Sequence, residues 1–285
     1  MERIKIFTRS FDLRLYRNSR GLYESLGIPV VRLTDQSADG YFYTMLKDTD
    51  CDIAINIDED AFLVSPKAVL ELVGLVVREG YANAGCPDGG GFCPRAGNPI
   101  VTNPFFNVFN LKLIRTRFSR AAVREFDYPS HKESMVASFP KERLETKWTF
   151  DRYVYEPYYS FFLWLAYSFK TLYLPSERHA DGTTTILKDP QGRIICMHSW
   201  FARFYTTPSW AVRFFEPQRG IQKARIDALI DECYGLRGMT RPHFTFADRL
   251  SFLGNKIIRW TIKVPQRISR WPYKIRLKLS KTGQS

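Results

Sequence analysis

The order of apolar and polar positions along the chain predicts short strands that alternate with helices. Segments rich in apolar residues at 3–8, 28–33 and 53–57 have the length of strands, and helical segments are expected between them. Pro66 then stands where a helix would begin, and the apolar residues after it recur every three or four positions. This alternation is typical of a mostly parallel sheet covered by helices on both faces, so we expect an α/β fold.

The pattern continues beyond a stretch with a different composition. Residues 85–104 are rich in glycine, proline and asparagine, which predicts a long loop that is either a flexible turn or a cover over a substrate. After it we expect strands at 105–111, 171–174 and 193–197, the last two completing the same sheet. Helices are expected at 41–47, from 112 to about 125, and at 157–169, 209–215 and 221–233.

Composition excludes several classes of protein. The five cysteines are scattered and form no Cys-x-x-Cys pair, which argues against a disulfide framework and a structural zinc site. No segment approaches the roughly 20 apolar residues that span a membrane, and the chain starts with a strand-like run instead of a signal peptide. We therefore expect a cytoplasmic protein of 285 residues with one large domain, 1–240.

Positive charge is concentrated at the C-terminal end. The net charge is +13, and residues 241–285 hold eleven basic residues against one acidic residue, so they account for +10. Apolar residues there recur at alternating steps of four and three from Phe246 to Val264, with Trp260 among them and basic residues on either side. We expect a basic amphipathic helical extension that associates with an anionic membrane surface, or else a helix packed on the domain. No nucleic-acid partner is expected, because no reader motif accompanies the charge.

Two carboxylates, Asp58 and Asp60, follow the apolar run at 53–57. The same Asp-x-Asp spacing occurs at 48–52, but those residues precede the run and fit a solvated turn. In an open α/β sheet, ligands bind beyond the carboxyl ends of the strands, so the later pair is the candidate for chemistry. Such a pair can hold a divalent cation against a diphosphate. The alternative is that it only caps the turn before Pro66.

Four features in this order resemble the GT-A glycosyltransferases: a strand that opens a nucleotide-binding half, Asp58-Glu59-Asp60 as a DXD motif, an acidic residue at the start of a later helix, and a histidine beyond it. The resemblance covers residues 1–210. It implies a GT-A, Rossmann-like fold and a metal-dependent glycosyltransferase that uses a nucleotide-sugar donor, with UDP as the expected nucleotide. The acceptor would be a glycan or a lipid-linked saccharide in surface polysaccharide or glycoconjugate synthesis. The enzyme would be peripheral on the cytoplasmic face of a membrane.

The resemblance also implies roles for single residues. Asp60 would bind the metal, and Asp58 would bind the metal or the ribose. His198, directly after the run at 193–197, would be a further metal ligand, although a histidine in such a place is often only a packed residue. Carboxylate oxygens suit Mg²⁺ or Mn²⁺, and an imidazole ligand favours manganese. His179, in a polar loop, is the weaker candidate.

An inverting transferase needs a base that removes a proton from the acceptor hydroxyl. Glu156 stands at the acidic position before the helix expected at 157–169, and Asp151 is the reserve candidate. The family position commonly carries two adjacent acids, whereas here Pro157 follows Glu156. The helix dipole alone would also favour an acid in this place, and a retaining reaction would not need this base.

Contacts with the nucleotide are expected from residues beyond the first two strands. They are Thr8, Arg9 and Ser10 after the first strand and Asp35 after the second. Arg203, five residues beyond His198, would donate hydrogen bonds to the diphosphate, or else form a surface ion pair.

Three other functions share parts of this pattern. A sugar-phosphate nucleotidyltransferase has a similar sheet and a metal, but it opens with a glycine-rich phosphate loop that residues 7–11 lack. A haloacid-type phosphatase would use Asp58 as nucleophile and Asp60 as acid, but Phe62 stands where a small residue is usual. A non-enzymatic basic protein that binds membranes or nucleic acid is the third alternative.

Overall fold

The computed structural model describes residues 2–34, 36, 38, 40–89, 97–127, 135, 137–140, 156, 158–202, 205, 217–258 and 261. Several predicted features lie outside the described residues: Asp35, Asp151, Arg203, the helix expected at 209–215, Trp260 and most of the C-terminal extension. In the part of the chain that the structure describes, no helix is both long and apolar enough to cross a membrane, and the four cysteines there are free and buried.

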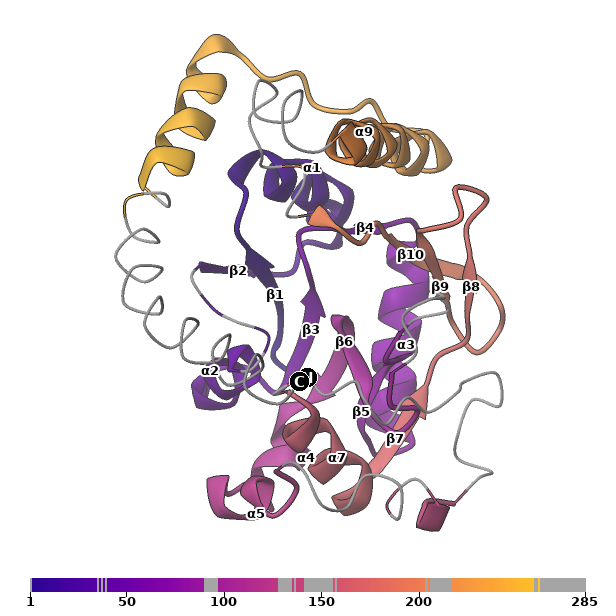
Figure 1. Ribbon diagram of the computed structural model, residues 1–285. Helices are drawn as coiled ribbons and strands as arrows, with labels where there is room; N and C mark the ends of the chain where they lie inside the picture. The colour runs from indigo at the N-terminus through magenta and orange to yellow at the C-terminus, as the bar shows by residue number, and fades with distance from the viewer. Residues whose placement is uncertain are drawn as a thin grey trace, which may run out of the picture.

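A six-stranded sheet forms the centre of the molecule (Figure 1). In spatial order its strands are β2 (Val30–Thr34), β1 (Ile4–Ser10), β3 (Ile53–Ile57), β6 (Thr102–Asn110), β5 (Tyr81–Pro87) and β7 (Lys170–Tyr173). Neighbouring strands are parallel except at β6, which runs antiparallel to β3 and β5. The prediction of a mostly parallel sheet is confirmed, and the carboxyl ends of β1, β2 and β3 meet at one edge.

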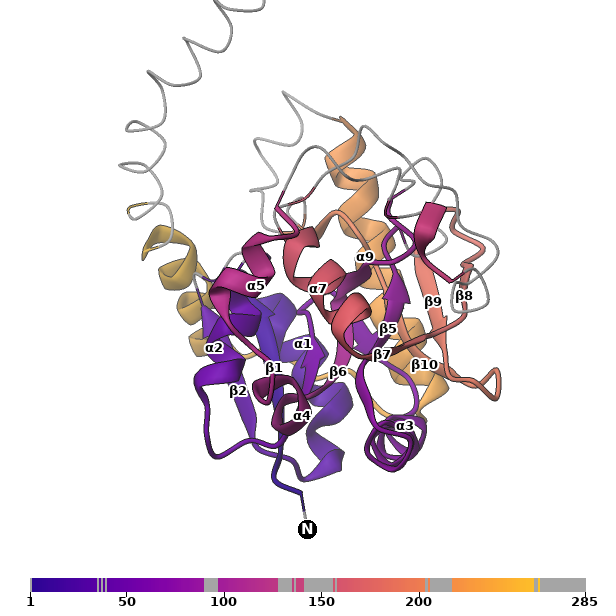
Figure 2. The same ribbon diagram turned by 90° about the horizontal axis from the view of Figure 1, so that it is seen from below.

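A smaller antiparallel sheet lies on the other side of the molecule from β2 in both views (Figure 1 and Figure 2). Its strands, in spatial order, are β4 (Ala61–Leu63), β10 (Ile194–His198), β9 (Thr185–Lys188) and β8 (Ser176–Arg178). The run at 171–174 joins the main sheet as β7, but the prediction that 193–197 does so is wrong. The reason is that β4 is buried and offers its edge to β10, so that His198 pairs with Ala61.

Helices cover both faces of the main sheet, as the sequence predicts. They are α1 (Leu13–Tyr23), α2 (Tyr41–Lys47), α3 (Pro66–Arg78), α4 (Leu111–Arg115), α5 (Arg120–Arg124), α7 (Tyr159–Ser168) and α9 (Pro217–Leu236). Alternate residues of one strand enter different cores. Ile6 packs in the core with α1, α3 and α9, and Phe7 packs in the core with α2, α4, α5 and α7.

The strand β5 lies partly where the sequence predicts a loop. The expected loop at 85–104 is shorter, because β5 continues through Pro87 and β6 begins at Thr102. Gly85 permits the close approach of these two strands, since a Cβ atom there would lie 2.4 Å from Asn107 Oδ1. The polar and glycine-containing composition of β5 thus reflects its packing in the middle of the sheet.

Candidate active site

A cleft of about 340 Å³ opens near the carboxyl ends of β1 and β3. Five residues predicted from the sequence line it: Arg9, Asp58, Asp60, Glu156 and His198. They come from the end of β1, the turn after β3, the segment before α7 and the end of β10. The structure therefore brings the predicted metal ligands, one predicted nucleotide contact and the predicted base to one place.

Asp58 forms an ion pair with Arg9. The guanidinium Nε donates to Asp58 Oδ1 at 3.3 Å, and Nη2 donates to Oδ2 in a close contact. Burial raises the pKa of Asp58, and Arg9 opposes this only in part. Burial would lower the pKa of Arg9, but the Asp58 carboxylate raises it. Asp58 thus has a fixed cationic partner that the sequence does not reveal. Because Arg9 occupies some of the lone pairs of the Asp58 carboxylate, fewer remain for a metal or a ribose.

Asp60 and His198 face each other in the cleft. His198 Nε2 lies 3.3 Å from Asp60 Oδ2, because the pairing of β10 with β4 sets His198 opposite Ala61. The Phe105 ring stacks on the imidazole with 4.2 Å between centroids, and the Trp200 ring lies 4.6 Å from it, so two aromatic rings restrain the imidazole. Burial would raise the pKa of Asp60, but His198 lowers it, so this carboxylate is ionised at neutral pH.

Asp60 and His198 fit a divalent cation as two of its ligands. Their donor atoms are 3.3 Å apart, and neighbouring ligands that each lie about 2.1 Å from one ion are about 3 Å apart. No group of three or more His, Cys, Asp or Glu side chains among the described residues could hold a metal ion. Two protein ligands would leave positions for diphosphate oxygens and water, which is how Mg²⁺ is commonly held. His198 Nδ1 is buried with no hydrogen-bond partner in the described part of the chain.

Glu59 is buried beside the cleft and ties two loops together. Its Oε2 accepts hydrogen bonds from Ser10 Oγ at 2.9 Å and from the backbone N–H groups of Phe11 and Asp12 at 2.9 and 2.8 Å. Burial raises the pKa of Glu59 to about 8, against the effect of these hydrogen bonds. The connection from β1 to α1 is thereby fixed to the turn after β3. The sequence pattern does not single out this residue.

One of the three residues predicted at the end of β1 lines the cleft. Thr8 is fully buried and shares a hydrogen bond of 2.8 Å with the Tyr23 hydroxyl. Ser10 is also buried and donates to Glu59. Arg9 lies between them in the strand, so its side chain points to the opposite face and reaches the cleft. The period of two along a strand explains why these neighbours do not lie in one site.

A buried carboxylate that the sequence analysis did not single out supports one wall of the cleft. Asp88 directly follows β5 and is 1% exposed. It accepts hydrogen bonds from Asn103 Nδ2 at 2.8 Å, from the Tyr158 hydroxyl at 2.9 Å and from the Tyr159 hydroxyl. Asn103 and Tyr158 line the cleft together with Glu156. The sequence contains one signal for Asp88, because this residue follows a strand as the Asp-x-Asp carboxylates of the cleft do. The composition of β5 resembles that of a loop, however, so the sequence pattern does not predict the strand.

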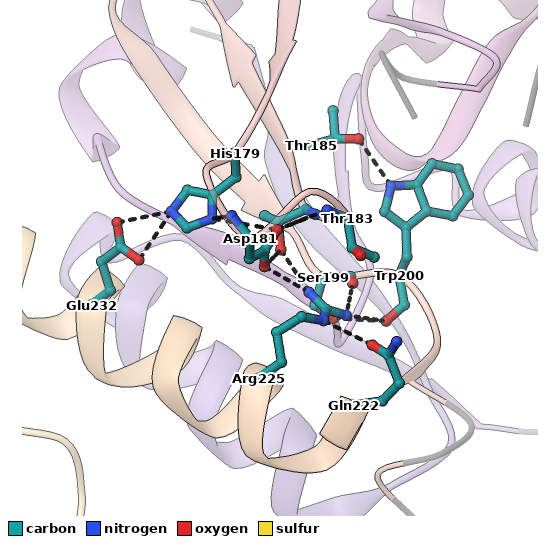
Figure 3. A network of polar contacts seen from close by, with 10 residues as sticks. His179, Asp181, Thr183, Thr185, Ser199, Trp200, Gln222, Arg225 and Glu232 are labelled. Atoms are coloured by element: carbon teal, nitrogen blue, oxygen red, sulfur yellow. Dashed lines mark hydrogen bonds and ion pairs between the residues drawn. The ribbon is translucent and has the colours of Figure 1, made fainter. Parts of the chain in front are cut away.

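His179 lies in a polar network outside the cleft (Figure 3). Its Nε2 is 3.2 Å from Glu232 Oε2 on α9, and its Nδ1 accepts a hydrogen bond from the Asp181 backbone at 3.1 Å. Both ring nitrogens are therefore engaged by groups of the network. Of the two histidines considered from the sequence, the structure brings only His198 to the candidate metal ligands.

The turn after β10 has an unusual backbone. Trp200 and Phe201 have φ angles of 56° and 55°, a left-handed conformation that bulky side chains rarely adopt. Arg225 of α9 donates from Nη2 to the Ser199 carbonyl at 2.5 Å (Figure 3). Its Nη1 donates to Asp181 Oδ2 at 2.9 Å. Because Trp200 and Phe201 line the cleft, Arg225 restrains a strained turn at the candidate site.

Comparisons with known proteins show a distant likeness of fold. No protein-family model matches the chain, and no curated protein is similar to it. The structure of A197 from STIV is similar with a TM-score of 0.34 and 13% identity over 68% of this chain and 93% of that one. A glycosyltransferase involved in the glycosylation of the major capsid of PBCV-1 is similar with a TM-score of 0.29 and 12% identity, over 48% of this chain and 74% of that one. Likenesses at this level show nothing about the reaction.

Proposed function

We propose that this protein is a metal-dependent glycosyltransferase that moves a sugar from a nucleotide-diphosphate donor, with UDP as the expected nucleotide, to an acceptor hydroxyl. The observation that supports this most directly is the convergence of Asp60 and His198, with 3.3 Å between their donor atoms, beside the Arg9–Asp58 ion pair. The cleft that holds them lies near the carboxyl ends of parallel strands, where α/β sheets bind nucleotides.

In this proposal Asp60 and His198 hold the ion, Mn²⁺ or Mg²⁺. When bound, the ion supplies a Lewis acid that stabilises the charge of the departing diphosphate. Asp58 accepts from two of the five N–H groups of Arg9, so the same guanidinium can also donate to a diphosphate oxygen. Asp58 thereby orients Arg9, and its remaining lone pairs can reach the ribose or the ion.

Glu156 is the proposed base for an inverting reaction, because it lines the same cleft as the proposed metal ligands. It would accept the proton of the acceptor hydroxyl. Tyr158 and Trp200 give the same walls an aromatic character. The proposed acceptor is a glycan or a lipid-linked saccharide. Asp35, Asp151 and Arg203, outside the described residues, stay predictions.

The two alternative enzyme classes fit the geometry less well. A nucleotidyltransferase loop after β1 would use its backbone N–H groups to bind phosphate, whereas those of Phe11 and Asp12 donate to Glu59. A phosphatase would need Asp58 as a nucleophile free to attack, whereas Arg9 binds both of its oxygens. These contacts favour a transferase in which a metal ion, held by its protein ligands, would bind the diphosphate in place of a phosphate-binding loop.

Attachment to an anionic membrane surface, on the cytoplasmic face, is the second part of the proposal. Residues 246–258 are helical, and five large apolar side chains of this helix are exposed: Phe246 (76%), Leu250 (53%), Leu253 (54%), Ile257 (54%) and Ile258 (59%). Steps of three and four residues place the first four of them on one face. An exposed apolar face in a basic segment suits the interface of an anionic membrane, which favours this reading over a helix whose apolar face packs on the domain.

Thermal unfolding with nucleotide sugars, with and without Mn²⁺, tests the proposed reaction. The variant Asp60→Asn removes a proposed metal ligand, and Asp50→Asn is a matched control in an exposed turn. A UDP-sugar with Mn²⁺ should raise the Tm of the wild type and of Asp50→Asn but not that of Asp60→Asn. Mn²⁺-dependent donor hydrolysis should be lost in the same variant. Full turnover by Asp60→Asn, or no response of the wild type to any nucleotide sugar, would contradict the proposal.

A further inference from the structure

A second cavity, of about 600 Å³, lies between α1, the end of α9 and the segment that follows α9. Figure 1 shows this segment leaving α9, passing over α1 and entering the yellow helix of residues 246–258. The cavity walls include four basic and two aromatic side chains: Arg14, Arg241, His243, Arg249, Phe244 and Phe252. Within the described residues, this cavity and the candidate active site share no wall residue.

Two arginines of α1, Arg14 and Arg17, lie one turn apart but have different surroundings. Arg17 forms an ion pair with Asp248, and its guanidinium carbon lies 5.3 Å from the centroid of the Phe252 ring. Arg14 has no acidic partner within the described part of the chain, and its Nε is buried without an acceptor. A buried N–H group without an acceptor is unfavourable, so a ligand oxygen that accepts a hydrogen bond from Arg14 would be favoured here.

The basic groups of the cavity outnumber the acids that could neutralise them. Arg241 is paired with Asp227 at 2.6 Å and with Asp231 at 3.1 Å. Arg249 is exposed at the cavity wall and, like Arg14, forms no ion pair with another described residue. Two guanidinium groups that lack a carboxylate suit an anion with several acceptor oxygens, and phosphate matches the fork of N–H groups that guanidinium presents.

We propose that this cavity binds the phosphate of an anionic lipid headgroup. A lipid is favoured over free phosphate because Phe244 and Phe252, with ring centroids 5.0 Å apart, give the cavity an apolar wall. Arg249 and Phe252 of the cavity wall belong to the same helix as the exposed apolar face of residues 246–258, so a membrane that meets this face would lie close to the cavity. The inference rests on the membrane attachment proposed above and does not depend on glycosyl transfer.

Sedimentation of the full chain with phosphatidylcholine vesicles, with or without phosphatidylglycerol, tests the proposal. Arg14→Gln removes a proposed headgroup contact, whereas Lys256→Gln removes the same charge from residues 246–258 outside the cavity. Arg20→Gln is a second control, on the exposed side of α1. We expect Arg14→Gln to weaken binding to the anionic vesicles about tenfold and both controls to weaken it much less. Equal losses in Arg14→Gln and Lys256→Gln would overturn the proposal, because binding would then follow net charge alone.

Inorganic phosphate and glycerol 1-phosphate, titrated calorimetrically without vesicles, distinguish the source of the phosphate. Binding of free phosphate that is as tight as binding to anionic vesicles would overturn the assignment to a lipid. If Arg14→Gln fails to fold, Arg249→Gln at the exposed wall position carries the same expected tenfold loss. Donor hydrolysis by Arg14→Gln should equal that of the wild type, and Asp60→Asn should keep its vesicle binding. Failure of the headgroup site is thereby distinguished from failure of the proposed reaction.

Discussion

The cleft and the polar network around Arg225, which includes Asp181 and Thr184, both pair partly buried carboxylates with basic groups, but these carboxylates differ in what else they contact. In the cleft, Asp60 faces His198 and an open volume of about 340 Å³. In the network, Asp181 accepts hydrogen bonds from two backbone N–H groups, from the Thr184 hydroxyl and from Arg225. Asp60 therefore keeps acceptor capacity for a ligand, whereas the donors of the protein satisfy Asp181.

This difference separates two uses of partly buried charge in one molecule. Burial would raise the pKa of both carboxyl groups, but hydrogen bonds from Thr184 lower the pKa of Asp181, and His198 lowers that of Asp60. A carboxylate whose acceptor positions are filled by protein donors stabilises the fold. A carboxylate with one protein partner beside a cleft can still bind a ligand. Substitutions should therefore change stability in the network and turnover in the cleft.

The largest effect is expected for the histidine in the cleft. His198→Gln should lower Mn²⁺-dependent donor hydrolysis by about 10²- to 10³-fold, because it removes one of the two proposed protein ligands. His179→Gln is the matched control and should keep a rate close to that of the wild type, since His179 lies outside the cleft beside Glu232. Initial rates over a series of Mn²⁺ concentrations measure both. An unchanged Mn²⁺ dependence in His198→Gln would remove the distinction between the two histidines.

The next effect tests whether the network supports the cleft. Arg225→Met removes the donors to Asp181 and to the Ser199 carbonyl, so it should lower the free energy of unfolding by about 3 kcal/mol. The strained turn at Trp200 should relax as well, which should raise KM for the donor about tenfold. Urea unfolding and steady-state kinetics measure the two changes, and Arg225→Lys should recover part of the stability. A variant with normal stability and normal KM would show that the turn does not need this contact.

A pH series should show the stabilising role of the network carboxylate. The pKa of Asp181 is below its ordinary value in the folded protein, since hydrogen bonds from Thr184 and Arg225 outweigh the effect of burial. Its contribution to stability is therefore complete above the ordinary pKa of about 3.9 and is lost as the pH falls towards the lower folded-state pKa. Asp181→Asn should lower the free energy of unfolding by about 2 kcal/mol at neutral pH and by less as the pH falls below about 4. Urea unfolding across this range, with Asp50→Asn as the exposed control, measures it, and a difference that stays constant with pH would contradict the assignment.

The elements that position the site were predictable where the apolar pattern is clear. The expected strand at 53–57 and helix at 41–47 coincide with β3 and α2, because a mostly apolar run and helical spacing define them. The strand β5 was missed because Asn83, Gly85 and Pro87 give it the composition of a loop. Its place between β6 and β7 comes from tertiary packing, which a local pattern does not contain.

The candidate site was predictable only as far as strand ends define it. Asp58 and Asp60 follow β3, so the sequence predicts their place at the carboxyl edge of the main sheet. His198 ends β10 of the smaller sheet, and the pairing of β10 with β4 brings it to Asp60. The contact of Arg9 with Asp58 depends on how β1 and β3 lie side by side, which the sequence does not state. The contact of Arg225 with the turn after β10 likewise depends on where α9 packs, so sequence spacing could not reveal it.

The smallest effect is expected where the network and the cleft meet. Trp200 Nε1 donates to Thr185 Oγ1 at 2.9 Å, and the Trp200 ring lies against His198. Thr185→Val removes this acceptor with little change of shape, and should lower the free energy of unfolding by about 1 kcal/mol because the indole N–H stays buried. If Trp200 transmits the effect of the network to the cleft, the KM for the donor should rise about twofold while kcat stays unchanged. Urea unfolding and steady-state kinetics measure both, with Thr183→Val as the control on the same hairpin. A loss of stability without a change in KM would mean that the network stabilises the fold but does not position the cleft through this tryptophan.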